Sequence, residues 1–129
     1  MTDVTRNNFE ELYPRICEIL KKCSFVGIDT EFTSLTANSS CITSLFDSGN
    51  QRYEKLRESA QSSVLSQIGL AIFTQDRNTL NYEVETYNFY LCPQSCGSQD
   101  KRFLCQASSF EFLARHKFDF NKVDISQRL

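Results

Sequence analysis

FVGIDTEFTSL, residues 25–35, places two acidic residues, Asp29 and Glu31, two positions apart inside an apolar run. Side chains alternate between the faces of a strand, so Asp29 and Glu31 would share one face and Thr30 would point to the other. Two carboxylates this close raise the pKa of at least one of them or attract a cation, because an unpaired buried charge is unfavourable. The stretch therefore predicts a strand and leaves two interpretations of the pair open, of which the first is a cation site, most simply a metal site. A strand end at which both carboxylates reach water is the alternative.

The whole chain has the composition of one ordinary globular domain. It has 129 residues, of which 40% are hydrophobic and 23% charged, and its formal net charge is −2. This length suits one domain and is too short for two, and the charge gives no general attraction to RNA, so a nucleic-acid site would be local or metal-mediated. No apolar run is long enough to span a membrane, and the start MTDVTRNNFEE does not have the pattern of a signal peptide. We expect an intracellular protein of the cytoplasm, the nucleus or both.

The cysteines and the single histidine give weaker signals. Without a secretory signal, the six cysteines are expected to be reduced thiols. Cys92 and Cys96 could form half of a zinc site, but no second pair of Cys or His follows at zinc spacing. His116 lies in the polar stretch RHK, which indicates a solvated surface side chain. Neither group predicts a metal site of its own.

Helical and strand patterns alternate along the chain. Apolar spacing and composition predict, in order, helix 8–23, strand 24–33, helix 51–62, strand 63–74, strand 82–93 and a helix capped by Ser108 or Ser109. Residues 34–50, rich in Ser, Thr and Asn, predict a loop or insertion. Pro14 either occupies the first turn of the first helix or kinks it. The order of elements predicts an α/β or α+β layer with the acidic pair on its first strand.

The second and third predicted strands differ in their patterns. Strand 63–74 is continuously apolar, as expected of a strand covered on both faces, and the short linker to strand 82–93 favours an antiparallel pair. Polar Gln67 and Asn88 interrupt these strands. Each is either a buried amide satisfied by the backbone or a contact in a site.

Five motifs give the chain a resemblance to a known family. They are, in order, NNFEELYP, FVGIDTEFTSL, RYEKLRESAQSSVLSQIGLAIF, YNFYLCP and FLCQASSFEFLARHKFDFNKV. Their order and spacing resemble the amino-terminal part of PARN-type 3′-to-5′ exoribonucleases, a DEDD-superfamily group that includes poly(A)-specific ribonucleases and PARN-like piRNA trimmers. The resemblance implies an α/β, RNase H-like nuclease fold. Residues 1–129 would form its amino-terminal segment, with three core strands and flanking helices.

The resemblance also implies roles for particular residues. Asp29 and Glu31 match the first two of four carboxylates that hold two divalent ions, normally Mg²⁺; Asp29 would bridge the ions and Glu31 would orient the attacking water. Phe32 and Leu35 match positions that contact the terminal nucleotide, and Phe110 matches, more weakly, an apolar position against the substrate base. Core packing is the alternative role for these three side chains. The implied partners are the 3′ end of a single-stranded RNA and a second copy of the chain in a homodimer.

The sequence departs from the family pattern in two respects. The family's other two metal-binding aspartates come far downstream, and Asp119 and Asp124 do not replace them. We therefore expect either part of a Mg²⁺-dependent exoribonuclease acting on poly(A) or piRNA-precursor 3′ ends, or an inactive truncated product that at most binds RNA or protein. Ser34 and Lys117 stand where the family favours glycine. A positive φ at either position would cost roughly 1 kcal/mol.

Overall fold

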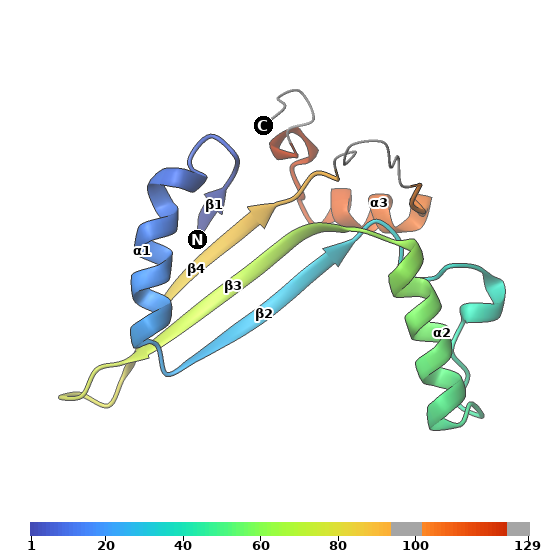
Figure 1. Ribbon diagram of the computed structural model, residues 1–129, viewed down its shortest axis with the longest axis horizontal. Helices are drawn as coiled ribbons and strands as arrows, with labels where there is room; N and C mark the ends of the chain where they lie inside the picture. Colours follow the sequence, from blue (N-terminus) through green and yellow to red (C-terminus); the bar gives the residue numbers. More distant parts are fainter. Residues whose placement is uncertain (94–101, 124–129) are drawn as a thin grey trace. The chain divides into compact units, whose positions relative to one another are not determined.

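The computed structural model describes residues 1–93 and 102–123, which divide into two compact units (Figure 1). The first unit contains Met1–Glu31, Gln67–Cys92 and the segment from Phe120, and the second contains Phe32–Ser66 and the segment from Pro93 to Asp119. No helix in the described ranges is long and apolar enough to cross a membrane. The acidic pair lies in the first unit, whereas Phe32, Leu35 and Phe110 belong to the second.

The first unit is built on a four-stranded sheet (Figure 1). Its strands are β1 (Thr2–Val4), β2 (Phe25–Phe32), β3 (Leu65–Gln75) and β4 (Tyr82–Tyr90), in the order β1-β4-β3-β2. The last residue of β2 and the first two of β3 are assigned to the second unit. β3 and β4 are antiparallel neighbours, which confirms the prediction from their short linker. The sequence pattern does not reveal β1, because a strand of three residues is too short to show a period.

Helix α1 (Phe9–Lys22) covers one face of this sheet. Its Ile16 is buried against Val4, Ile72 and Tyr87, so the core of the unit joins the helix to three strands. The helix begins at Phe9 and runs through Pro14, so the alternative that places this proline in the first turn is wrong.

The opposite face of the sheet has no such helix among the described residues of the first unit. Side chains alternate along β3, so Ile72 reaches the core while its neighbour Ala71 points to the other face and lines a pocket. The described part of this unit thus covers one face of β3 with a helix, and cover on both faces stays a prediction.

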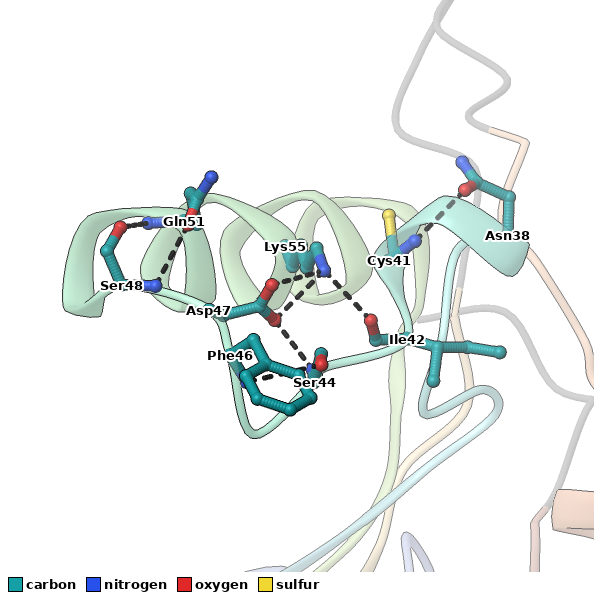
Figure 2. A network of polar contacts seen from close by, with 9 residues as sticks. All are labelled: Asn38, Cys41, Ile42, Ser44, Phe46, Asp47, Ser48, Gln51 and Lys55. Carbon is teal, nitrogen blue, oxygen red and sulfur yellow. Dashed lines mark hydrogen bonds and ion pairs between the residues drawn. The ribbon is translucent and has the colours of Figure 1, made fainter.

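The second unit contains the segment that was expected to be a loop, and this segment is ordered. It holds a short helix, η1 (Ser39–Cys41), and helix α2 (Gly49–Ser62) begins two residues before the predicted start at Gln51. Ser48 caps α2: its Oγ accepts a hydrogen bond from the N–H of Gln51, and the Gln51 side chain accepts one from the N–H of Ser48 (Figure 2). This reciprocal capping fixes where the helix begins.

An ion pair holds the preceding loop against α2 (Figure 2). Lys55 Nζ lies 2.9 Å from both carboxylate oxygens of Asp47 and 3.0 Å from the carbonyl oxygen of Ile42. The backbone N–H of Ser44, and then Lys55, hold the pKa of Asp47 below its ordinary value. Nearby Phe46 is 97% exposed, so these polar contacts, and not burial of Phe46, hold this part of the loop.

Helix α3 (Ala107–Arg115) follows in the second unit and starts earlier than predicted. Its N-cap residue is Gln106, and no side chain caps it, so the predicted cap at Ser108 or Ser109 is wrong. Ser109 is instead buried inside the first turn. The cap prediction failed because a serine near a helix start has the same sequence signal whether it precedes the helix or lies within it.

The end of α3 explains one of the two departures from glycine. Lys117 has φ 63°, its N–H donates to the carbonyl oxygen of Ala114 at 3.2 Å, and the N–H of Phe118 donates to that of Leu113 at 3.0 Å. These two bonds define a Schellman motif, whose left-handed position is usually glycine. A positive φ is therefore confirmed at Lys117, whereas Ser34 is not among the described residues with positive φ.

Candidate active site

The acidic pair lies on the face of the sheet opposite α1. Val26 of β2 packs against the core, so the alternating positions of Asp29 and Glu31 point away from the helix. Both residues line a pocket of about 340 Å³ in the first unit. Asp29 is exposed and Glu31 is half-buried. The two carboxylates therefore share one pocket, as the spacing of two residues predicts.

A row of residues from three adjacent strands forms part of this pocket. Gly69 of β3 pairs with Asn88 of β4. A Cβ on Gly69 would lie 3.6 Å from the Cβ of Asp29 and 3.5 Å from Oδ1 of Asn88. Asp29, Gly69 and Asn88 therefore follow one another across the sheet, and the glycine leaves the space between the other two side chains open.

Two carboxamides accompany the carboxylates. Gln67 and Asn88 both line the pocket and both are half-buried. Nδ2 of Asn88 donates to Sδ of Met1 at 3.2 Å, and within the described part of the chain neither carboxamide is hydrogen-bonded to backbone. The alternative in which these amides are satisfied by the backbone is therefore disfavoured, and a role in the site is favoured.

Sequence reasoning missed Gly69, although a signal was present. A glycine inside an apolar strand weakens that strand and often marks a close approach by a ligand or another chain segment. The sequence pattern could have identified the position of this glycine, but not the residues that lie beside it in the sheet. Those neighbours, Asp29 and Asn88, come from parts of the chain that lie far apart in sequence.

The chemistry of the pocket suits a hard cation. Of the described residues that line it, two are acidic and none is lysine or arginine. Carboxylate and amide oxygens are the ligands that Mg²⁺ prefers. No cluster of three or more Asp, Glu, His or Cys side chains that could hold a metal occurs in residues 1–93 and 102–123. The donors present thus fit one ion that keeps much of its hydration, not a metal enclosed by protein ligands.

The three apolar residues matched to RNA contacts lie in the second unit. Leu35 is 69% exposed, so it does not pack into the core of the described residues. Phe110 is 37% exposed and Phe32 is half-buried, so each is partly packed and partly accessible.

The remaining polar candidates are spread over the chain. His116 is exposed at the end of α3, with Nδ1 2.8 Å from the carbonyl oxygen of Phe112, as expected of a surface histidine. Asp119 lies in the second unit, and Cys96 and Asp124 fall outside the described residues.

Comparison with known proteins identifies the family. The model of the CAF1 family ribonucleases matches residues 4–125. Poly(A)-specific ribonuclease PARN of Danio rerio is 40% identical over 94% of this chain, and the pre-piRNA 3′-exonuclease trimmer of Bombyx mori is 36% identical over 93%. The chain belongs to the CAF1 ribonuclease family, which confirms the resemblance seen in its motifs. It spans about a fifth of the length of these relatives, 19% of the first and 23% of the second.

A solved structure supports the same assignment. The Mg²⁺- and Mn²⁺-bound form of S. pombe Pop2p matches with a TM-score of 0.65 and 26% identity, over 95% of this chain and 45% of that one. The α/β, RNase H-like fold implied by the resemblance is thereby confirmed. Divalent metal ions are present in that relative.

Proposed function

We propose that this chain supplies the metal-binding strand of a Mg²⁺-dependent 3′-to-5′ exoribonuclease site that acts on single-stranded RNA 3′ ends. The observation that carries the proposal is the position of Asp29 and Glu31 on one strand face, lining a single pocket without a described basic residue. Membership of a ribonuclease family and the metal ions bound by Pop2p support it. Relatives named for poly(A) and for piRNA precursors are similar to the chain, so the proposed substrate class covers both.

The residues of the chain would act through their oxygens. Divalent ions, when bound, activate water for in-line attack on a phosphodiester and stabilise the leaving oxygen. Asp29 would hold the metal through its carboxylate. Glu31 would bind one ion and accept a hydrogen bond from the attacking water, which orients that water toward phosphorus.

Apolar residues of the second unit would hold the RNA. Phe32, Leu35 and Phe110 would pack against the terminal bases, because stacking and apolar contact bind single strands without reading their sequence. The exposure of Leu35 supports this role, since its side chain is accessible to a ligand.

A second candidate function follows from the number of acidic ligands. The described residues supply two, and a pair of ions needs more. Residues 1–129 by themselves would then bind an ion or RNA without hydrolysis. Homodimerisation and an intracellular location stay predictions. Sedimentation equilibrium tests homodimerisation.

Metal binding tests the proposal directly. Mn²⁺ titration of residues 1–129, followed by electron paramagnetic resonance, should show one weak site from which Mg²⁺ displaces Mn²⁺. Asp29→Asn should abolish this site and Glu31→Gln should weaken it. Glu83→Gln is the matched control, because Glu83 is an exposed β4 carboxylate outside the pocket and its loss should change nothing. Binding that survives Asp29→Asn would overturn the proposal.

A further inference from the structure

We propose that Asn88 is a further positioning residue of this site, and that its carboxamide oxygen binds the hydration shell of the divalent ion held by Asp29. Gly69 leaves open the space through which the two residues interact. The inference rests on the proposed metal-binding function. It adds a neutral hydrogen-bond acceptor from β4, which acts through water, to the two acidic ligands of β2.

The register of the sheet brings the three residues together. Asn88 pairs with Gly69, and Asp29 lies on the other side of Gly69, with its Cβ 3.6 Å from the position of a glycine Cβ. Adjacent strands are about 4.8 Å apart, so the backbones of Asp29 and Asn88 are separated by roughly 10 Å. Because Mg–O bonds are about 2.1 Å long, a shared water molecule suits this span better than direct coordination of one ion by both side chains.

The orientation of the Asn88 amide favours this role. Its Nδ2 donates to Sδ of Met1, and its Oδ1 lies 3.5 Å from the position of a Cβ on Gly69, on the side toward Asp29. No described group donates a hydrogen bond to Oδ1 of Asn88. Water bound to a divalent cation is a strong hydrogen-bond donor, and a half-buried carbonyl oxygen without a protein donor is a suitable acceptor for it.

The space at Gly69 is the second requirement. A methyl group there would be in ordinary van der Waals contact with Asp29 and Asn88, so the backbone can accept it. The same methyl group would occupy the position through which a water molecule connects the two side chains. Filling this space should therefore weaken ion binding while the side chains of Asp29 and Asn88 stay in place.

The test uses Mn²⁺ as probe on isotopically labelled residues 1–129. Substoichiometric Mn²⁺ should broaden the side-chain amide signals of Asn88 and leave those of Asn78, in the turn between β3 and β4, unchanged. Asn88→Leu should weaken Mn²⁺ binding about 10-fold, the range typical of outer-shell residues. Asn88→Asp should strengthen binding several-fold, because it adds a negative charge facing the ion. Asn78→Leu, the same substitution in the turn between β3 and β4 and outside the pocket, is the matched control and should leave affinity unchanged.

The outcomes separate this inference from the proposed function. Loss of binding in Asp29→Asn together with unchanged binding in both Asn88 variants would overturn the role of Asn88 alone. Absence of Mn²⁺ binding by the wild-type chain would overturn both. Thermal unfolding of each variant shows whether it is folded. Because Asn88→Asp is expected to gain affinity, loss of folding cannot mimic the expected result.

Discussion

The Cβ of Asp29 lies 3.6 Å from the position that a Cβ on Gly69 would occupy. The residue of β3 beside the proposed metal ligand is therefore one that has no side chain to fill this space. A glycine inside a strand costs stability, since it is more flexible in the unfolded chain and has no side chain to pack. Its presence at this position is explained if the space is used by a ligand.

Gly69→Ala should therefore have opposite effects on stability and on metal binding. The free energy of unfolding, measured in urea, should rise by about 0.5–1 kcal/mol. Affinity for Mn²⁺ should fall several-fold, because the methyl group occupies the space between Asp29 and Asn88.

Gly49→Ala is the control for this prediction. Gly49 opens α2 in the second unit, and nothing lies within 4 Å of where its Cβ would be. The change should stabilise the helix without altering Mn²⁺ affinity. Unchanged or tighter Mn²⁺ binding in Gly69→Ala would contradict the proposed use of the space.

A polypeptide of residues 1–129 should not shorten RNA. Its described residues supply two acidic ligands, which bind a hydrated ion weakly and cannot position a pair of ions. Without that pair, neither the attacking water nor the leaving oxygen is stabilised, and each effect is commonly worth several kcal/mol of barrier. The measurement is gel analysis of 5′-labelled single-stranded RNA with Mg²⁺, run beside Asp29→Ala/Glu31→Ala. Metal-dependent shortening seen in the wild type alone would require further ligands within these residues.

The contribution of Asp47 to stability should depend on pH. Hydrogen bonding to Ser44 and the ion pair with Lys55 lower its pKa in the folded chain, so the unfolded chain binds a proton more readily. The contribution is complete above the unfolded pKa of about 4 and is lost as the pH falls through the lower folded value. The stability difference between the wild type and Asp47→Asn, measured by urea unfolding, should shrink from about pH 6 to about pH 3.

Lys55→Met tests the same ion pair from the other side. It removes the cation that lies 2.9 Å from both Asp47 oxygens, and its deficit in stability should also shrink on acidification. A difference that stays constant across this pH range, for either variant, would show that the ionised form of Asp47 does not stabilise the fold.

Lys117→Gly should stabilise the chain. The residue has φ 63° at the end of α3, where a side chain costs roughly 1 kcal/mol relative to glycine. Thermal unfolding should show an increase in Tm. Lys117→Ala retains the Cβ and should bring no such gain in Tm. An equal gain from alanine would show that the effect comes from loss of the lysine charge and not from backbone conformation.

Local patterns were sufficient to predict much of the fold. The apolar run around 25–32 predicts the strand, and the spacing of two residues predicts the common face of Asp29 and Glu31, because alternation of side chains is a property of a single strand. Helical spacing predicts α1 within one residue at each end. The motif order was specific enough to identify the ribonuclease family before any strand was paired.

Only the tertiary structure decided which residues meet. The alternation of side chains tells which face of β4 Asn88 occupies, but not which residue of β3 lies beside it, since that depends on the register between the two strands. The parallel pairing of β1 with β4 likewise depends on contacts distant in sequence. The sequence by itself determined the local conformations, the family and the acidic pair. The sheet register decided that Gly69 and Asn88 lie beside that pair, because hydrogen bonding between strands, not the pattern within any one of them, sets the register.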